Sequence, residues 1–354
     1  MNSRLLNVYS QLEERKLEGL LVSSPANISY LTGFLSRDAY LLVCRKGNVY
    51  FTDSRYSEEA GNSLKPSFRL RECNGPVFFK SLAQTALRLK IKRLGFEERY
   101  LPFAEFARIK DHLGVRCEMV PGFGIVEHKR QVKEPAEISR IRQGMRITAV
   151  AFEHIKRFIT CGMRESEVAA EFERFIRSRG CNSSAFETIV ASGPNSSQPH
   201  HLSGCRRIKA GEPVLIDFGV DYRGYKTDLT RVLFLGKIDI LVRRVYDIVR
   251  KAQELAIKRV RPGAEMAAID KVVREYITRK GYGRYFTHNL GHGLGLEVHE
   301  DPRISGNEAS ALKPGMVFTI EPGIYLAGRF GIRIEDMILV TNKGCEVLSG
   351  TVDQ

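Results

Sequence analysis

Two segments of the chain, residues 208–220 and 312–324, align without a gap over thirteen positions. In both segments a Lys-x-Gly turn leads into an apolar stretch, an acidic residue closes or follows that stretch, and a glycine stands two positions beyond the acid. Two unrelated hairpins with similar turns could share part of this pattern, but a gap-free match of this length favours a duplicated structural unit. We therefore predict a fold that contains two copies of one unit.

Amphipathic helices are expected upstream of each segment. In the first copy they cover residues 136–160 and 164–179 and are separated at Gly162, and Gly263 marks the corresponding break in the second copy. Apolar residues at helical spacing, with a glycine between two runs, are typical of paired helices. The repeated unit is predicted to be two helices and a β-hairpin, which gives an α+β domain with an internal pseudo-twofold repeat.

The part of the chain before the repeat has a different pattern. Short apolar strands, such as 19–23 and 49–52, alternate with amphipathic helices, which predicts an α/β domain. The Pro-Gly stretch at 121–124 and the charged run after it interrupt this alternation. Because a length of 354 residues suggests about two domains, we place the α/β domain at 1–125 and the α+β domain at 126–354.

Composition argues against several classes of protein. The seven cysteines are scattered and form no CxxC pair, which is typical of a reduced intracellular protein. No apolar stretch matches a signal peptide or a membrane span, so a cytoplasmic location is expected. The net charge of +14 is spread over both predicted domains instead of forming a tail or stripe, which argues against a dedicated nucleic-acid role.

The first repeated hairpin carries two acidic residues. Asp217 and Asp228 are symmetric in number about the midpoint between Tyr222 and Arg223. We therefore expect the two carboxylates to lie directly opposite each other across a hairpin. Like charges in that position destabilise a sheet, and a bound cation between the acids would remove the repulsion.

The second hairpin repeats this arrangement, because Glu321 and Glu335 are symmetric about Gly328. Apolar residues flank both acids, which indicates a partly buried site. Unpaired buried carboxylates would cost several kcal/mol each, and divalent cations resolve that cost at neutral pH. The alternative is a set of structural salt bridges with the basic residues nearby, which are Arg231, Arg333 and Lys226.

Three of the eight histidines fall in one segment, residues 287–300, where they are His288, His292 and His299. Glycines at alternate positions of this segment permit close approach of the backbone and make a core helix unfavourable. One imidazole with four carboxylates is a mostly hard ligand set that suits a pair of divalent ions, such as Mn, Co, Zn or Fe. Two such ions indicate metal-assisted hydrolysis.

The motifs together resemble the proline-specific metallopeptidases, the prolidase and aminopeptidase P group, whose catalytic domain has the pita-bread fold. The segments that carry the resemblance are 199–200, 216–219, 225–231, 288–300, 320–325 and 331–336. Segments 27–34 and 51–56 are similar to the creatinase-type α/β domain that precedes the catalytic domain in this group. The resemblance therefore covers nearly the whole chain.

The resemblance also implies roles for single residues. It implies five metal ligands, which are Asp217, Asp228, His292, Glu321 and Glu335. Glu321 would additionally handle the proton of the attacking water, and His200 and His299 would stabilise the developing oxyanion. His288 would lie near the substrate on the proline side, and Arg333 would lie beside the metal ligands. The chain departs from the family pattern at Lys226, Thr227 and His201, none of which is a ligand.

The implied activity is that of a two-metal exopeptidase that hydrolyses the bond between a residue and a following proline. The compact two-domain form favours an Xaa-Pro dipeptidase, and an Xaa-Pro aminopeptidase that acts on longer peptides is the alternative. Mn or Co are the expected ions, and a homodimer is expected by resemblance. From another class, a non-catalytic peptide- or protein-binding module on the same fold remains open, although the intact ligand set argues against it.

Overall fold

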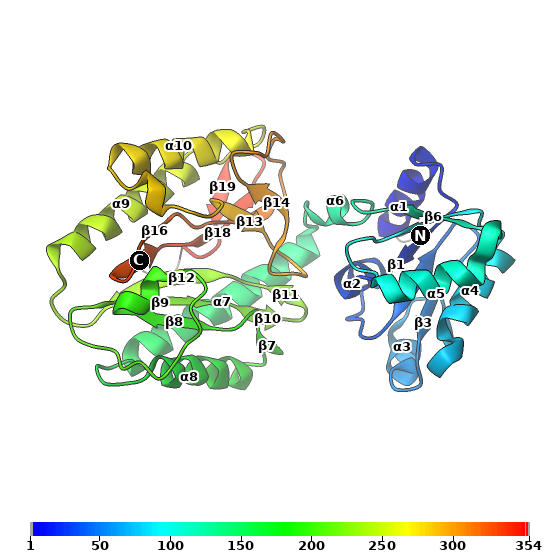
Figure 1. Cartoon of the computed structure of the whole chain (residues 1–354), viewed down its shortest axis with the longest axis horizontal. Coiled ribbons are helices and arrows are strands. Elements are labelled where there is room, and N and C mark those ends of the chain that lie inside the picture. Colours follow the sequence, from blue (N-terminus) through cyan, green and yellow to red (C-terminus); the bar gives the residue numbers. More distant parts are fainter. Residues whose placement is uncertain (1–2, 351, 353–354) are drawn as a thin grey trace. The chain divides into compact units, whose positions relative to one another are not determined.

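The computed structural model describes residues 3–350 and 352, which form parts of two compact units, Met1–Arg130 and Gln131–Gln354. A mixed six-stranded sheet in the order β4-β3-β2-β1-β5-β6 is the centre of the first unit (Figure 1). Strands β1, β5 and β6 are parallel, as are β3 and β4, whereas β2 is antiparallel to both its neighbours. The strands are β1 (Gly19–Val22), β2 (Tyr40–Val43), β3 (Asn48–Thr52), β4 (Phe68–Glu72), β5 (Arg93–Phe96) and β6 (Glu118–Pro121).

Helices connect and cover this sheet, which confirms the predicted α/β class. They are α1 (Ser3–Glu14), α2 (Pro25–Thr32), α3 (Ser57–Ser63), α4 (Phe78–Arg88), α5 (Phe103–Leu113) and α6 (Glu127–Arg130). Helix α2 has a local signal at each end: Ser24 accepts a hydrogen bond from the backbone N–H of Asn27, and Gly33 ends the helix with φ of 78°. Apolar periodicity in the sequence did not predict helices α2 and α3 or strand β4.

Helix α6 lies inside the stretch that was expected to link the domains. The Nδ2 of Asn27 donates a hydrogen bond to Glu127 Oε1 at 2.7 Å, and Arg130 Nη1 donates to Asn27 Oδ1 at 2.7 Å. All three side chains are buried. These bonds hold α6 within the first unit, which is why the division between the compact units falls after Arg130.

Among its described residues the second unit has four long helices, and they lie on both sides of its strands, α7 and α8 on one side and α9 and α10 on the other (Figure 1). They are α7 (Pro135–Phe158), α8 (Glu165–Ser178), α9 (Ile240–Ile257) and α10 (Met266–Arg279). Helix α7 begins with proline at its first position, and the side chain of Glu137 accepts a hydrogen bond from the backbone N–H of Glu134. No helix in the described residues is long and apolar enough to cross a membrane.

The strands of the second unit form several small sheets. The main ones have the orders β12-β9-β8 and β14-β13-β15-β18-β19. The strands are β7 (Ser183–Ser184), β8 (Ile189–Ser192), β9 (Pro213–Phe218), β10 (Val220–Tyr222), β11 (Tyr225–Lys226), β12 (Leu229–Phe234), β13 (Gly291–Gly293), β14 (Glu300–Ile304), β15 (Val317–Ile320), β16 (Gly323–Leu326), β17 (Phe330–Arg333), β18 (Asp336–Val340) and β19 (Cys345–Val347).

Alternate residues of these strands face two separate apolar cores. On β9, Leu215 packs with the core of α9 and α10, whereas Ile216 packs with the core of α7 and α8. On β15, Phe318 and Val317 divide in the same way. Because successive side chains of a strand point to opposite faces, strands covered by helices on both sides are apolar at most positions. An acid in such a strand lies among buried groups.

Corresponding hydrogen bonds in the two halves of this unit confirm the internal repeat. The N–H of Gly162 donates to Ile208 O at 2.8 Å, and in the second half the N–H of Gly263 donates to Leu312 O at 2.9 Å. These are the glycines at the helix breaks and the first residues of the two aligned segments. Each bond ties a helix break to the start of its hairpin, so the duplicated sequence forms a duplicated structure.

The registers of the two hairpins differ in how well they were predicted. In the second half, Ile320 pairs with Asp336 and Gly323 with Arg333, which is the register of the predicted symmetry about Gly328. In the first half, Asp217 pairs with Thr230 instead of Asp228. The expectation that Asp217 and Asp228 lie directly opposite each other is therefore wrong.

The turn explains the error. Arg223 and Gly224 occupy its two central positions with φ of 52° and 85°, the left-handed pair that a type I′ hairpin requires. The glycine therefore takes the second central position, and the midpoint lies one residue later than the predicted one. This moves the partner of Asp217 by two residues along β12, to Thr230. Asp228 consequently lies near Asp217 as a diagonal neighbour.

Candidate metal centre

The predicted ligands stand at the ends of strands from both halves of the second unit. Asp217 lies near the end of β9, and Asp228 directly precedes β12. Glu321 follows β15, Glu335 precedes β18, and His292 is the middle residue of β13. The ends of these strands meet in the interior of the unit, between the two helix pairs.

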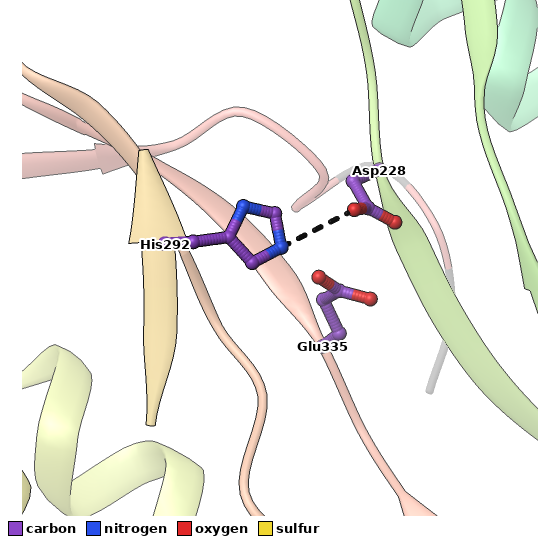
Figure 2. Close-up of side chains that lie close together, drawn as sticks. All are labelled: Asp228, His292 and Glu335. Carbon is purple, nitrogen blue, oxygen red and sulfur yellow. Dashed lines mark ion pairs between the residues drawn. The ribbon is translucent and has the colours of Figure 1, made fainter. Parts of the chain in front are cut away.

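Asp228, His292 and Glu335 converge on one point, as Figure 2 shows. Each offers one ligand atom, and these atoms all lie within 4.8 Å of one another. The Nε2 of His292 is 3.5 Å from Asp228 Oδ2 and also 3.5 Å from Glu321 Oε1. The structure therefore places three of the other four predicted ligands, which are Asp228, Glu321 and Glu335, around the His292 imidazole.

The chemistry of this donor set fits divalent cations. Oδ1 of Asp217 and Oδ1 of Asp228 are buried without a hydrogen-bond partner, which is costly for a carboxylate unless an ion occupies the site. Burial, with the charges of Glu335 and Asp217, raises the pKa of Asp228 well above its usual range. Burial and the charge of Glu321 do the same for Glu335. Bound cations would stabilise all of these charged forms.

Burial also keeps the ring of His292 in the neutral form that can bind a metal ion. Burial, with the charge of His299, lowers the pKa of His292 to about 4, so its imidazole is neutral at pH 7. A neutral imidazole has the free lone pair that a metal ion requires. The Nδ1 of His292 lies 3.1 Å from Gly293 O, and this contact leaves Nε2 directed at Asp228 and Glu321.

In the described part of the chain, only Asp217 of the five predicted ligands forms the structural salt bridge with a nearby arginine or lysine that was the alternative to metal binding. Arg333 Nη2 donates to Asp217 Oδ2 at 2.5 Å, and the pair is buried. The other two candidates pair elsewhere, because Arg231 Nη2 lies 2.7 Å from Asp336 Oδ1 and Lys226 pairs with Asp221. Among the described residues, no Lys or Arg forms a salt bridge with Asp228, Glu321 or Glu335.

Hydroxyl groups that the sequence analysis did not single out orient the acids. Thr230 Oγ1 donates to Glu335 Oε2 at 2.7 Å, and Thr319 Oγ1 donates to Glu321 Oε1 at 3.2 Å. Thr230 is two residues from Asp228, and Thr319 is two residues from Glu321. The period of two in a strand could have identified both threonines, because it places each on the same face as a ligand.

The remaining predicted residues surround the ligands. The His299 ring packs edge-on against His292 with centroids 4.3 Å apart. His288 Nε2 is 2.9 Å from the hydroxyl of Tyr325, which in turn accepts a hydrogen bond from Arg333 Nη1 at 2.9 Å. His200 is exposed, and burial, with a contribution from the neighbouring His200, lowers the pKa of both His288 and His299. The role of Tyr325 was missed, since a tyrosine in an apolar strand gives no specific signal.

The glycines of the 287–300 segment are required by close packing, as expected. A Cβ on Gly291 would lie 1.9 Å from Thr319 O, and a Cβ on Gly293 would lie 2.4 Å from Asp301 O. Both positions flank His292. The two glycines thus let the backbone of β13 approach its neighbours closely enough to bring His292 to the acids.

Comparison with known proteins supports the same assignment. Residues 139–342 match the model of metallopeptidase family M24, and residues 4–132 match that of the Creatinase/Prolidase N-terminal domain. An Xaa-Pro dipeptidase of Pyrococcus horikoshii is 33% identical over 353 residues, which cover 99% of this chain and 98% of the relative.

Solved structures agree over both units. An Xaa-Pro dipeptidase from Bacillus anthracis has a TM-score of 0.95 at 35% identity, with 99% of this chain and 98% of the other covered. An X-Pro aminopeptidase from Thermotoga maritima MSB8 has a TM-score of 0.87 at 38% identity, with 96% and 97% covered. The predicted creatinase-type domain and pita-bread catalytic fold are thereby confirmed. The chain belongs to metallopeptidase family M24, whose members are metal-dependent hydrolases, and it carries the Creatinase/Prolidase N-terminal domain before its catalytic domain.

Proposed function

We propose that the chain is a two-metal exopeptidase that hydrolyses Xaa-Pro bonds, with Xaa-Pro dipeptides as its main substrates. The observation that carries the proposal is the convergence of Asp228, His292 and Glu335 within 4.8 Å, deep in the unit and with no Lys or Arg partner for either acid among the described residues. The names of the similar proteins support the substrate class, since Xaa-Pro dipeptidases match along nearly the whole chain.

The proposed ligands divide between two sites that share acids. Asp217 and Asp228 would hold one ion, and Asp228 and Glu335 would also reach the second, which His292 and Glu321 complete. Mn or Co are the proposed ions, and Zn or Fe are the alternatives, because the set combines one imidazole with carboxylates. When bound, the ions supply a Lewis acid for the substrate carbonyl and a water of lowered pKa.

The side chains of this protein carry out the proton transfers and hold the substrate. Burial raises the pKa of Glu321 to about 8 in the metal-free protein, and bound cations would lower it, which leaves a carboxylate that can accept a proton. We assign it the proton of the attacking water, which it delivers to the departing proline nitrogen. His200 and His299 are assigned to the developing oxyanion as hydrogen-bond donors.

His288 and Arg333 are assigned to the proline side of the substrate and to the support of the ligands. Burial and the charge of Arg333 lower the pKa of His288 to about 4, so the ring is neutral at pH 7 and held by Tyr325. Arg333 reaches Asp217, Thr230 and Tyr325 with three different nitrogens. One guanidinium thus fixes three groups that border the site.

The test is hydrolysis of Gly-Pro and Ala-Pro beside Ala-Pro-Ala and a longer Xaa-Pro peptide, after incubation with Mn²⁺ or Co²⁺ and with a chelator control. Cleavage of the dipeptides alone is the expected result. Preference for the longer peptides would instead establish an Xaa-Pro aminopeptidase, which the 38% identity to the Thermotoga maritima protein favours as the second candidate. Metal binding without any cleavage would indicate a non-catalytic binding module.

Two further properties belong to the proposal. We infer a homodimer, on the basis of the family resemblance, and light scattering at micromolar concentration checks it, with a monomer as the contradicting result. We also propose a cytoplasmic location, which the scattered free cysteines support. Fractionation of the producing cell, with the protein located by antibody, tests that location, and recovery outside the cytoplasm would contradict it.

A further inference from the structure

The residues that follow His200 and His299 are both anchored by buried contacts between side chains. His201 Nε2 lies 2.8 Å from Glu165 Oε2, and the two side chains are 12% and 0% exposed. Glu300 Oε1 lies 2.8 Å from Lys133 Nζ, and these side chains are 7% and 1% exposed. His200 and His299 themselves are exposed. Each proposed oxyanion donor therefore precedes a residue that is locked into the interior.

The carboxylate of Glu165 accepts hydrogen bonds from several polar groups of the loop that carries His200. At the start of the loop, Ser192 donates to Glu165 Oε1 from both its N–H and its hydroxyl at 2.7 Å. Asn195 Nδ2 donates to Glu165 Oε2 at 3.0 Å, and at the far end the N–H of Gly204 donates to the same oxygen at 3.4 Å. One buried carboxylate at the first turn of α8 thus fixes the loop at both ends and at His201.

Lys133, which lies near the start of the second unit, holds the loop that carries His299. Its backbone N–H donates to Gly315 O at 2.9 Å, which fixes its own position. The space around its ion pair with Glu300 is full, because a Cβ on Gly295 would lie 2.7 Å from Glu300 Oε1 and 3.1 Å from Lys133 Cε. Glu300 is the first residue of β14. The ion pair therefore sets the point at which the chain leaves His299 and enters the sheet.

We propose that Glu165 and Lys133 are positioning residues, which act through His201 and Glu300 to hold the backbone from which His200 and His299 reach the substrate. The proposal rests on the proposed function for the roles of these two histidines. His200 lies in a turn and His299 in a bend, so neither is held by the hydrogen bonds of a sheet, and the anchored neighbour fixes the backbone that carries each histidine. A displacement of about 1 Å in such a group can lower a rate by about 100-fold.

Two double-mutant cycles test the proposal. His201→Ala and Lys133→Met should each lower kcat by about 10- to 100-fold, with KM and metal content close to those of the wild type. His201→Ala should have no further effect when His200 is already alanine, and Lys133→Met should have none when His299 is already alanine. An equal loss of kcat in both backgrounds would overturn the proposal, because the anchors would then act independently of the histidines.

Two additional variants separate positioning from damage to the fold. His201→Gln retains a side-chain N–H donor for Glu165 and should recover most of the kcat that His201→Ala loses. Lys133→Met with Glu300→Met removes both buried charges, which folded proteins tolerate well, and it should show the same kcat loss as Lys133→Met alone. Wild-type kcat in this double variant, or no recovery with glutamine, would contradict the inference.

Hydrogen exchange provides a readout that does not depend on activity. Amides of residues 193–204 should exchange faster in His201→Ala, and those of 296–300 faster in Lys133→Met, while the rest of the unit is unchanged. His154→Ala is the matched control, because it removes the histidine of another His–Glu pair, with Glu171, between α7 and α8. If the wild type cleaves no Xaa-Pro peptide, the proposed function is wrong, and exchange unchanged in these loops would still overturn the positioning role.

Discussion

The acids of the two halves of the catalytic unit are neutralised in different ways. In the first half, Asp217 accepts a hydrogen bond at 2.5 Å from the guanidinium of Arg333. In the second half, Glu335 accepts its hydrogen bond at 2.7 Å from the uncharged hydroxyl of Thr230. Arg333 comes from the second hairpin and Thr230 from the first, so each half completes the other. The duplicated hairpins therefore place the acids close together. Because Arg333 of the second hairpin pairs with Asp217 of the first, the charge of Asp217 is compensated, and the other acids remain available to bind cations.

The largest effect is expected from Asp228→Asn, because among the described residues Asp228 has no Lys or Arg partner. Activity should fall by about 1,000-fold or more with loss of bound metal, since the substitution removes a shared ligand. The chelated variant should nevertheless unfold at a higher temperature than the chelated wild type, because a repelling buried charge is gone. Activity, metal analysis and thermal unfolding measure the three effects.

Asp217→Asn is the matched substitution at the acid whose charge is compensated by Arg333. It should also lower activity, but it should destabilise the chelated protein by about 3 kcal/mol or more, because Arg333 is left as an unpaired buried charge. If both variants shifted the unfolding temperature in the same direction, the contrast between the two halves would be lost.

Arg333→Lys should have the next largest effect. A lysine can keep the ion pair with Asp217 but cannot also reach Thr230 and Tyr325, because it lacks the fork of a guanidinium. We expect activity to fall by about 10- to 100-fold, as is typical when a group that orients metal ligands is replaced. Steady-state kinetics at saturating Mn²⁺ measures this. Tyr325→Phe, which removes only one of the three contacts, should lose less, and wild-type activity of Arg333→Lys would show that the exchange of partners is dispensable.

A smaller effect is expected on stability as a function of pH. In the metal-free protein the pKa of Glu321 is raised from 4.5 to about 8, so the folded state holds a proton that the unfolded chain has lost. The stability that Glu321 contributes to the metal-free protein is therefore lost as the pH rises from about 4.5 to about 8. His292 has the opposite sign, because its pKa is lowered from 6.5 to about 4 and its contribution is lost only as pH falls below about 6.5.

Between pH 6.5 and 8 the histidine no longer contributes, and buried carboxyl groups account for the change. Glu321 should cost the chelated protein on the order of 2 kcal/mol across this range, measured by denaturant unfolding, and Glu97, outside the metal centre, adds to the loss because its pKa is raised to about 7. Saturation with Mn²⁺ should abolish the part that comes from the metal centre, because bound cations require the deprotonated carboxylates. Glu321→Gln should weaken the slope in the chelated protein. Equal slopes with and without metal would contradict this assignment of the shifts.

The smallest effect concerns the turn that sets the register of the first hairpin. Gly224→Ala places a Cβ at φ of 85° and should cost about 1 kcal/mol in the free energy of unfolding. Gly344→Ala is the control, because it has open space and no left-handed φ. Denaturant unfolding of both variants measures the difference. An unaffected Gly224→Ala variant would show that the turn does not constrain the register.

Sequence alone predicted what depends on local pattern. The strand after each Lys-x-Gly turn, the acid that follows it and the glycines around His292 are local features, and they lie where expected. The pairing of Asp217 with Thr230 was missed because the turn type depends on backbone dihedrals at Arg223 and Gly224. A shift of one residue in the turn moved the partner of Asp217 by two positions and so kept Asp228 beside it.

Contacts between distant segments could not be predicted in the same way. Arg333 was expected near the ligands by resemblance, but several acids were within its reach along the sequence, and only packing selects Asp217. Glu165 lies at the start of a helix, where an acid is favoured in any case by the helix dipole. Its role in binding His201 depends on an irregular loop whose path has no periodic signal.

The most direct test of the account is the number of Mn²⁺ ions that the folded chain binds, measured by equilibrium dialysis and elemental analysis for the wild type and Asp228→Asn. The account predicts two ions per wild-type chain and loss of bound metal in the variant, with both proteins folded by circular dichroism. A folded wild-type chain that binds neither Mn²⁺ nor Co²⁺, Zn²⁺ or Fe²⁺ would contradict the proposal that these buried carboxylates form a metal centre.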